Sequence, residues 1–133
     1  MILVSACLVG VRCRYDARRC EIPEEVRNVL KEGLCLVPVC PEQLGGLPTP
    51  RPKNDLTWRR AKPTVINEEG RDVTPEFLSG AEETLRIARL VGVKRAIFKS
   101  RSPSCGEDGV TTRLLREEGI EVTVINAPGE GIG

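Results

Sequence analysis

The sequence contains no histidine, the commonest general base and the commonest nitrogen ligand for metals. Acid–base chemistry must therefore use Asp, Glu, Ser, Tyr, Lys or Cys, and a site for a soft metal must be built from thiolates. Aromatic residues make up only 3% of the chain, with a single Trp and a single Tyr. That scarcity disfavours a protein that binds single-stranded nucleic acid by base stacking. A net charge of +1 gives no reason to expect a surface that tracks phosphates.

Long apolar runs are also missing, since no stretch approaches the ~20 residues of a membrane span. Residues 4–7 (VSAC) imitate a lipoprotein cleavage box, but no basic region precedes them and only six residues stand before the cysteine. This disfavours a signal peptide, so we expect a cytoplasmic protein. Thiols stay reduced in the cytoplasm, and the six cysteines therefore indicate metal binding or catalysis before disulfides.

The length of 133 residues and an apolar content of 40% predict one globular domain, over residues 1–126, followed by a flexible Gly-rich tail at 127–133. Short apolar runs predict strands, and periodic stretches between Pro and Gly predict helices. Thr74 is expected to cap the longest helix. The alternation of short strands with helices predicts an α/β fold with a parallel sheet and helices on both faces. The expected strands are 1–6, 34–39, 95–99 and 120–125, and the expected helices are 23–31, 74–91 and 110–118. Residues 41–63 should form a long functional loop, followed by a short edge strand at 64–67.

Three cysteines follow the ends of predicted strands. Cys7 follows the first strand, Cys40 follows the second, and Cys105 lies in the loop after the third. Because ligands bind beyond the carboxyl ends of parallel strands, these thiols should converge on one edge of the sheet. No C-x-x-C pair is present, so a zinc finger or a thioredoxin-like dithiol is not indicated. Three thiolates without a fourth partner suit an iron–sulfur cluster with one open iron.

The other three cysteines have different contexts. Cys35 lies within an apolar run, where we expect a small buried hydrophobic residue. Cys13 and Cys20 flank a basic turn, CRYDARRC. They could be exposed thiols, spare ligands or neither.

A carboxylate and several hydroxyls accompany the candidate ligands. Glu42 stands two residues after Cys40 in VCPE. Alone it would be read as a solvated loop charge, but beside a cluster in a chain without histidine it is the best candidate proton carrier. The turn SRSPSCG, residues 100–106, is rich in hydroxyls that could stabilise charge on an attacked ring.

At these residues the sequence resembles the thiouracil desulfidases, a bacterial family long catalogued as a domain of unknown function. The matching segments are residues 5–15 (SACLVGVRCRY) with the following Asp16, 37–51 (VPVCPEQLGGLPTPR), 70–83 (GRDVTPEFLSGAEE) and 99–106 (KSRSPSCG). The resemblance implies a Rossmann-like fold and a [4Fe-4S] cluster ligated by Cys7, Cys40 and Cys105. In the family the open iron takes the sulfur of a thiolated pyrimidine, whose carbon–sulfur bond is hydrolysed with release of sulfide.

The resemblance also implies roles for polar residues. Glu42 and Ser102 correspond to the proton-transferring pair, with Ser100 as the competing serine. Ser100, Ser104 and Asp16 are the expected substrate contacts. The implied substrate is thiouracil or a thiouridine nucleotide, and no nucleic-acid or membrane partner is expected.

Two departures from the family pattern leave a second function open. Family members usually insert a YDGTFSG-like segment after SPSCG, whereas Gly106 here leads almost directly to Val110. The glycine usual after CRYD is replaced by Ala17. A shortened pocket wall would suit a non-enzymatic redox sensor or sulfur carrier, or an enzyme with a changed substrate. Glu42 and the hydroxyl-rich turn favour a desulfidase, since a carrier needs no proton donor.

Overall fold

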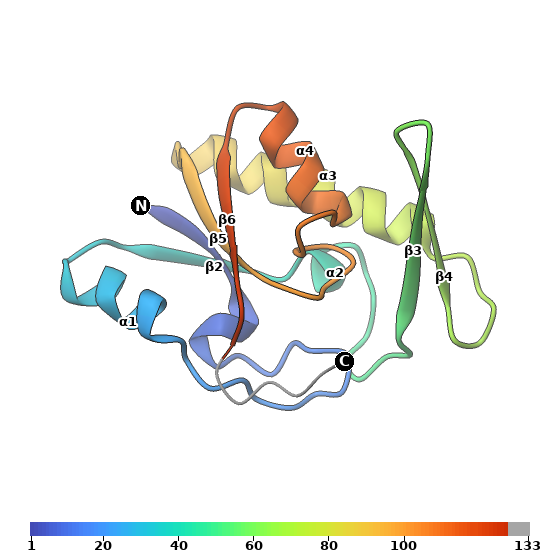
Figure 1. Ribbon diagram of the computed structural model, residues 1–133, viewed down its shortest axis with the longest axis horizontal. Helices are drawn as coiled ribbons and strands as arrows, with labels where there is room; N and C mark the ends of the chain where they lie inside the picture. Colours follow the sequence, from blue (N-terminus) through green and yellow to red (C-terminus); the bar gives the residue numbers. More distant parts are fainter. Residues whose placement is uncertain (128–133) are drawn as a thin grey trace.

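The computed structural model describes residues 1–127 and contains a four-stranded sheet, a separate hairpin and the helices that cover them (Figure 1). The predicted tail lies, from residue 128 onward, outside the described residues. The elements in chain order are β1 (Ile2–Ser5), η1 (Ala6–Val9), α1 (Glu24–Lys31), β2 (Leu36–Val39), α2 (Pro41–Leu44), β3 (Asn54–Arg59), β4 (Lys62–Asn67), α3 (Thr74–Val91), β5 (Arg95–Lys99), α4 (Val110–Glu117) and β6 (Glu121–Ile125).

The four-stranded sheet has the order β2-β1-β5-β6, and all of its strands are parallel. The central strand β1 pairs with β2 in a register that sets Ile2 opposite Leu36, and with β5 in one that sets Leu3 opposite Ala96. All four residues of β1 are buried, which is why its sequence is continuously apolar up to its last residue, Ser5. The predicted parallel α/β sheet is confirmed.

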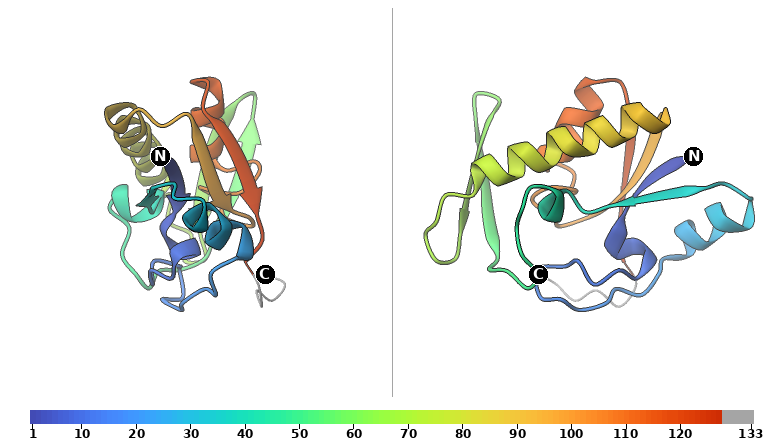
Figure 2. Two further views of the ribbon diagram at one scale, coloured as in Figure 1. Left: turned by 90° about the vertical axis from the view of Figure 1, so that its left-hand side faces the viewer. Right: turned by 180° about the vertical axis from the view of Figure 1, so that it is seen from behind.

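Helices cover both faces of this sheet, as predicted. On one face, Leu3 and Phe98 pack in a core with residues of α3 and α4. On the other face, Val4 and Ile97 pack with Val26 of α1. Consecutive residues of a strand point to opposite faces, so β1 and β5 each contribute to both cores. Figure 2 shows the sheet between these helices from two further directions.

The prediction that residues 41–63 form one long loop is wrong. This segment has regular structure. It contains the short helix α2 and the strand β3, which pairs antiparallel with β4. The predicted edge strand at 64–67 is therefore part of β4 and belongs to a two-stranded sheet, not to the main one. This hairpin stands apart from the main sheet, at the end of the molecule where α3 begins (Figure 1).

The long helix α3 spans the residues predicted for it, but its capping differs. The Thr74 hydroxyl does not cap the helix; it accepts a hydrogen bond from the backbone N–H of Val65 at 2.8 Å. The Asp72 carboxylate accepts the N–H of Thr74 at 2.9 Å. Hydrogen bonds from the Thr74 side chain and then from its backbone lower the pKa of Asp72. Gly92, at φ 76°, ends the helix in the left-handed conformation that glycine adopts most readily. Within the described part of the chain, no helix combines the length and apolarity needed to cross a membrane.

Candidate functional site

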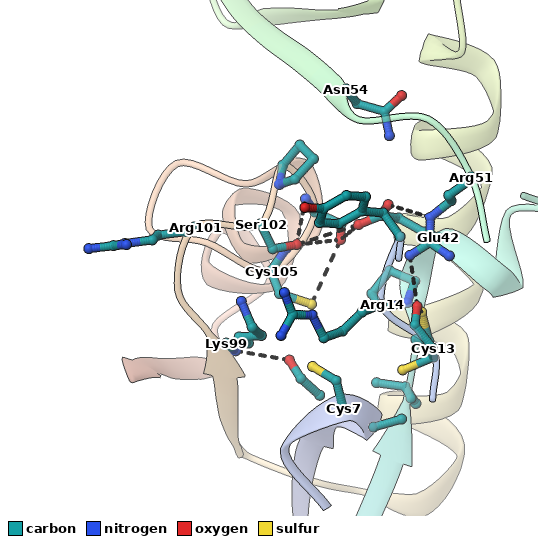
Figure 3. Close-up of a pocket in the computed structure, with 18 of the residues that line it drawn as sticks. Cys7, Cys13, Arg14, Glu42, Arg51, Asn54, Lys99, Arg101, Ser102 and Cys105 are labelled. Carbon is teal, nitrogen blue, oxygen red and sulfur yellow. Dashed lines mark hydrogen bonds and ion pairs between the residues drawn. The ribbon is translucent and has the colours of Figure 1, made fainter. Parts of the chain in front are cut away.

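The loops that follow β1, β2 and β5 meet at the carboxyl edge of the sheet. The chain leaves β1 toward β2 on one side and later adds β5 on the other, so the strand order reverses beside β1. Such a switch point is where open parallel sheets form their ligand sites. Cys7 in η1, Cys40 directly after β2, and Cys105 after β5 all line one cavity here, of about 250 Å³. Figure 3 shows Cys7 and Cys105 in this cavity.

Two further thiols lie next to the three predicted ones. Cys13 lines the same cavity and is 2% exposed, and Cys20 is buried in the core that includes Cys7. The Cys40 thiol also points at the backbone carbonyl of Cys13, at 3.7 Å. Of the alternatives left open for these two residues, exposed thiols are excluded. Cys35, expected to be buried within a strand, is exposed and lies outside β2, which begins at the next residue, Leu36.

The thiols act on one another. Hydrogen bonds from the Cys40 and Cys7 thiols lower the pKa of Cys13. The pKa of Cys7 is raised by Cys13, by Cys20 and by burial, and that of Cys40 by Cys13 and then by burial. Burial raises the pKa of Cys105 to about 12. Because the pKa values of Cys7, Cys40 and Cys105 are raised, binding a metal would require these thiols to release protons.

The donor set fits a cluster better than a single ion. Among residues 1–127, no three Cys, Asp or Glu side chains come close enough together to hold one metal ion. A single zinc ion would draw its ligand sulfurs to within about 4 Å of one another. Thiols spread around a cavity, without histidine, suit the larger framework of an iron–sulfur cluster, which is normally held by cysteine thiolates.

Glu42 is buried at the start of α2, on the cavity wall, and both of its carboxylate oxygens are occupied. Oε1 accepts the Nε–H of Arg51 at 2.9 Å. Oε2 accepts the hydroxyl of Ser104 at 2.8 Å and lies 3.5 Å from the hydroxyl of Ser102. Glu42 is therefore not a solvated loop charge, because the residue is buried at 7% exposure and its partner Arg51 is 8% exposed. In the sequence, Arg51 is marked only as the last residue of the matching segment 37–51.

The serines of the 100–106 turn divide into two groups. Ser102 and Ser104 line the cavity, with their hydroxyls 3.0 Å apart, and the Ser104 hydroxyl lies 3.8 Å from the Cys105 sulfur. The Ser102 oxygen also accepts the backbone N–H groups of Ser104 and Cys105, at 3.3 and 3.0 Å. Ser100 instead donates to the side chain of Asn126 and is not part of the lining.

Asp16 likewise lies outside the cavity lining. Its carboxylate pairs with Arg14 at 3.3 Å and accepts the backbone N–H of Arg18 at 3.0 Å. Arg14 does line the cavity, so Asp16 reaches the site only through this neighbour.

The cavity lining is strongly cationic. Glu42 is its one acidic residue, and the structure sets five basic residues around it. Lys99 donates from Nζ to the carbonyl of Ser100 at 3.1 Å, and Lys53 lies over the Tyr15 ring at 5.5 Å. Arg101 extends outward from the turn (Figure 3). Such a lining can balance both a set of thiolates and an anionic ligand. The basic residues are Arg14, Arg51, Lys53, Lys99 and Arg101.

Two glycines let α2 approach α3 closely and so place the candidate residues that α2 carries. A Cβ atom built at Gly80 would lie 1.9 Å from the carbonyl oxygen of Pro41, and one at Gly45 would lie 2.0 Å from that of Glu76. Cys40 is the N-cap of α2 and Glu42 lies in its first turn. The position of both residues therefore depends on a contact between the backbones of two helices.

Both departures noted in the sequence have a structural counterpart. Ala17 has a φ of 60°, in the left-handed region that explains the glycine usual at that position. The short loop after Gly106 is held from outside by the hairpin, because the Trp58 indole donates to the carbonyl of Asp108 at 2.8 Å. Arg113 lies over the same indole ring at 3.9 Å.

Comparisons with known proteins agree with this geometry. The family model of 2-thiouracil desulfurase matches residues 2–127. The uncharacterized protein YbbK of Bacillus subtilis (strain 168) is 32% identical over 143 residues, which covers 92% of this chain and 93% of that protein. A solved structure of TudS, described as a [4Fe-4S]-dependent thiouracil desulfidase, superposes with a TM-score of 0.81 at 37% identity, over 92% of this chain and 89% of the other.

Proposed function

The chain belongs to the 2-thiouracil desulfurase family, and we propose that it converts a thiolated pyrimidine to its oxo form with release of sulfide, using a [4Fe-4S] cluster held by Cys7, Cys40 and Cys105. The observation that carries this proposal is the meeting of these thiols and the buried Glu42 around one cavity. The similarity to TudS supports it independently. When bound, the cluster would supply a soft Lewis acid for the thiocarbonyl sulfur.

The chain's own polar groups would move the protons. Hydrolysis exchanges C=S and water for C=O and hydrogen sulfide, so no electrons are gained or lost. A proton must leave the attacking water, and the protonation of the ring must change as the sulfur departs. Glu42 would accept and return that proton through the Ser104 hydroxyl, which lies 2.8 Å from its carboxylate. The Ser102 hydroxyl, 3.0 Å from that of Ser104, would extend this path. The two backbone N–H groups that point at the Ser102 oxygen would stabilise negative charge there.

The charge of the lining supports one of the two substrate classes over the other. A free thiouracil base and a thiouridine nucleotide both offer the thiocarbonyl, but only the nucleotide carries a phosphate. The excess of basic residues around the cavity favours the nucleotide. A cytoplasmic location is part of the proposal, because an oxygen-sensitive cluster and free thiols require a reducing compartment.

A redox sensor or sulfur carrier is the competing function. Neither needs a buried carboxylate with hydroxyl partners next to the thiols, which is the arrangement found around Glu42. The contacts of this side chain therefore favour the enzyme.

The test is anaerobic sulfide release from 2-thiouracil, 4-thiouracil and 4-thiouridine monophosphate by wild type and Glu42→Gln. Glutamine keeps the shape of the side chain but cannot exchange a proton. The cluster should assemble normally while turnover falls by roughly 10² or more. A cluster-loaded wild type that releases no sulfide from any of these compounds would refute the desulfidase. A fully active Glu42→Gln would move the proton-carrying role to one of the serines.

A further inference from the structure

We propose that Arg51 is a positioning residue for desulfurisation, a role that rests on the proposed function and that no sequence pattern assigns. Its guanidinium is buried among four protein acceptors. Nε donates to Glu42 Oε1 at 2.9 Å, and Nη2 donates to the carbonyl of Cys13 at 2.8 Å. Nη1 donates to the carbonyl of Pro48 at 3.2 Å and to the hydroxyl of Thr49 at 3.0 Å.

These contacts fix which oxygen of Glu42 faces the reaction. With Oε1 bound to Arg51, the carboxylate cannot rotate without breaking a charge-assisted hydrogen bond inside the protein. Oε2 is thereby kept at the hydroxyls of Ser104 and Ser102. Arg51 thus selects the proton-accepting oxygen.

Arg51 also attaches the first cysteine-bearing loop to α2. Its backbone N–H donates to the carbonyl of Tyr15 at 2.8 Å, while its guanidinium holds the carbonyl of Cys13. Both of those residues line the cavity. One residue therefore links Glu42 to the loop that carries Cys13 and Tyr15.

The arrangement argues for positioning and against direct substrate binding, although Arg51 is part of the lining. A guanidinium has five N–H donors, and the protein already provides four acceptors for them. A lysine would keep the charge but not the planar fork that serves Glu42 and Cys13 together.

Steady-state kinetics of sulfide release from 4-thiouridine monophosphate and 2-thiouracil separate these roles. We expect Arg51→Met to lower kcat by about 10²-fold, the scale of a misplaced catalytic group, with KM within about threefold of wild type. The kcat of Arg51→Lys should lie between that of Arg51→Met and that of wild type. The control is Arg71→Met, which removes an exposed pair with Glu76 and should behave as wild type. A rise in KM with unchanged kcat would instead mean that Arg51 contacts substrate, and the proposal would be wrong.

A double-variant cycle covers the case in which Arg51→Met folds poorly, since it leaves a buried carboxylate without its counter-charge. In a Glu42→Gln background that charge is absent. There, adding Arg51→Met should change kcat by no more than about threefold, and the fall in Tm that it causes should be at most half of that seen with Glu42 present. Full additivity in kcat and Tm would refute the coupling. A cluster-loaded wild type without sulfide release would refute the proposed function and this role together, whereas an active wild type with wild-type-like Arg51 variants would refute the role alone.

Discussion

The contact between α2 and α3 can be tested by replacing Gly80 with alanine. The added Cβ would lie 1.9 Å from the carbonyl oxygen and 2.9 Å from the carbonyl carbon of Pro41, whereas real Cβ contacts essentially never fall below 3.0 Å. The nearest atoms belong to backbone, so no side chain can turn away. Moving from 1.9 Å to at least 3.0 Å requires α2 to shift by about 1.1 Å.

Two opposing effects decide the sign of the stability change. Alanine is favoured over glycine inside a helix by about 1 kcal/mol. Overpacking against a fixed neighbour typically costs about 1–3 kcal/mol, and the depth of this overlap places the cost at the upper end. We expect Gly80→Ala to lower the free energy of unfolding by about 1–2 kcal/mol. Because Pro41 stands between Cys40 and Glu42, turnover should fall by about 10²-fold, the usual effect of a displacement near 1 Å.

Urea unfolding, iron content and anaerobic sulfide release measure these effects. The matched control is Ser79→Ala, at an exposed position one residue earlier in α3, which improves helix propensity without a new contact. It should be at least as stable as wild type and fully active. If Gly80→Ala were more stable than wild type and equally active, helix propensity would be the larger effect. The close contact between α2 and α3 would then not determine the positions of Cys40 and Glu42.

Three other predictions concern the thiols and the first loop. Cys105→Ala should abolish cluster binding while Cys35→Ala, at an exposed position, leaves iron content unchanged; a Cys105→Ala protein with full iron would contradict the ligand set. Cys13→Ser should retain the cluster, because Cys7, Cys40 and Cys105 are the proposed ligands, and a loss of iron would make Cys13 a ligand. Ala17→Gly should raise the free energy of unfolding by about 1 kcal/mol, since it relieves a left-handed alanine, and an unchanged or lower unfolding midpoint in urea would contradict that reasoning.

Much of the main sheet was predictable because its signals are local. The apolar runs of β1 and β5 stand between polar segments, and α3 has both a periodic apolar face and a terminal glycine. Parallel strands then force the residues after them to the same edge, which is why the sequence alone predicts that Cys7, Cys40 and Cys105 lie together.

The parts that escaped prediction depend on contacts between distant segments. The segment with α2 and β3 is rich in Pro and Gly, and its structure comes from packing against α3 and pairing with β4. Cys13 reaches the other thiols only through the path of an irregular loop. The partnership of Arg51 with Glu42 spans nine residues without a helical or strand period, so no pattern indicates it.

The shortened loop after Cys105 raises the question of what supports that side of the cavity. In this chain the support comes from the β3–β4 hairpin, whose Trp58 binds the loop carbonyl of Asp108 and stacks under Arg113 from α4. A hydrogen bond and a cation–π contact each contribute about 0.5–1.5 kcal/mol, enough to hold a loop of a few residues. The same strand begins at Asn54, which lines the cavity. The hairpin thus supports the short loop after Cys105 from a distant part of the chain, and Ser102 and Ser104 lie against Glu42 without any further segment in that loop.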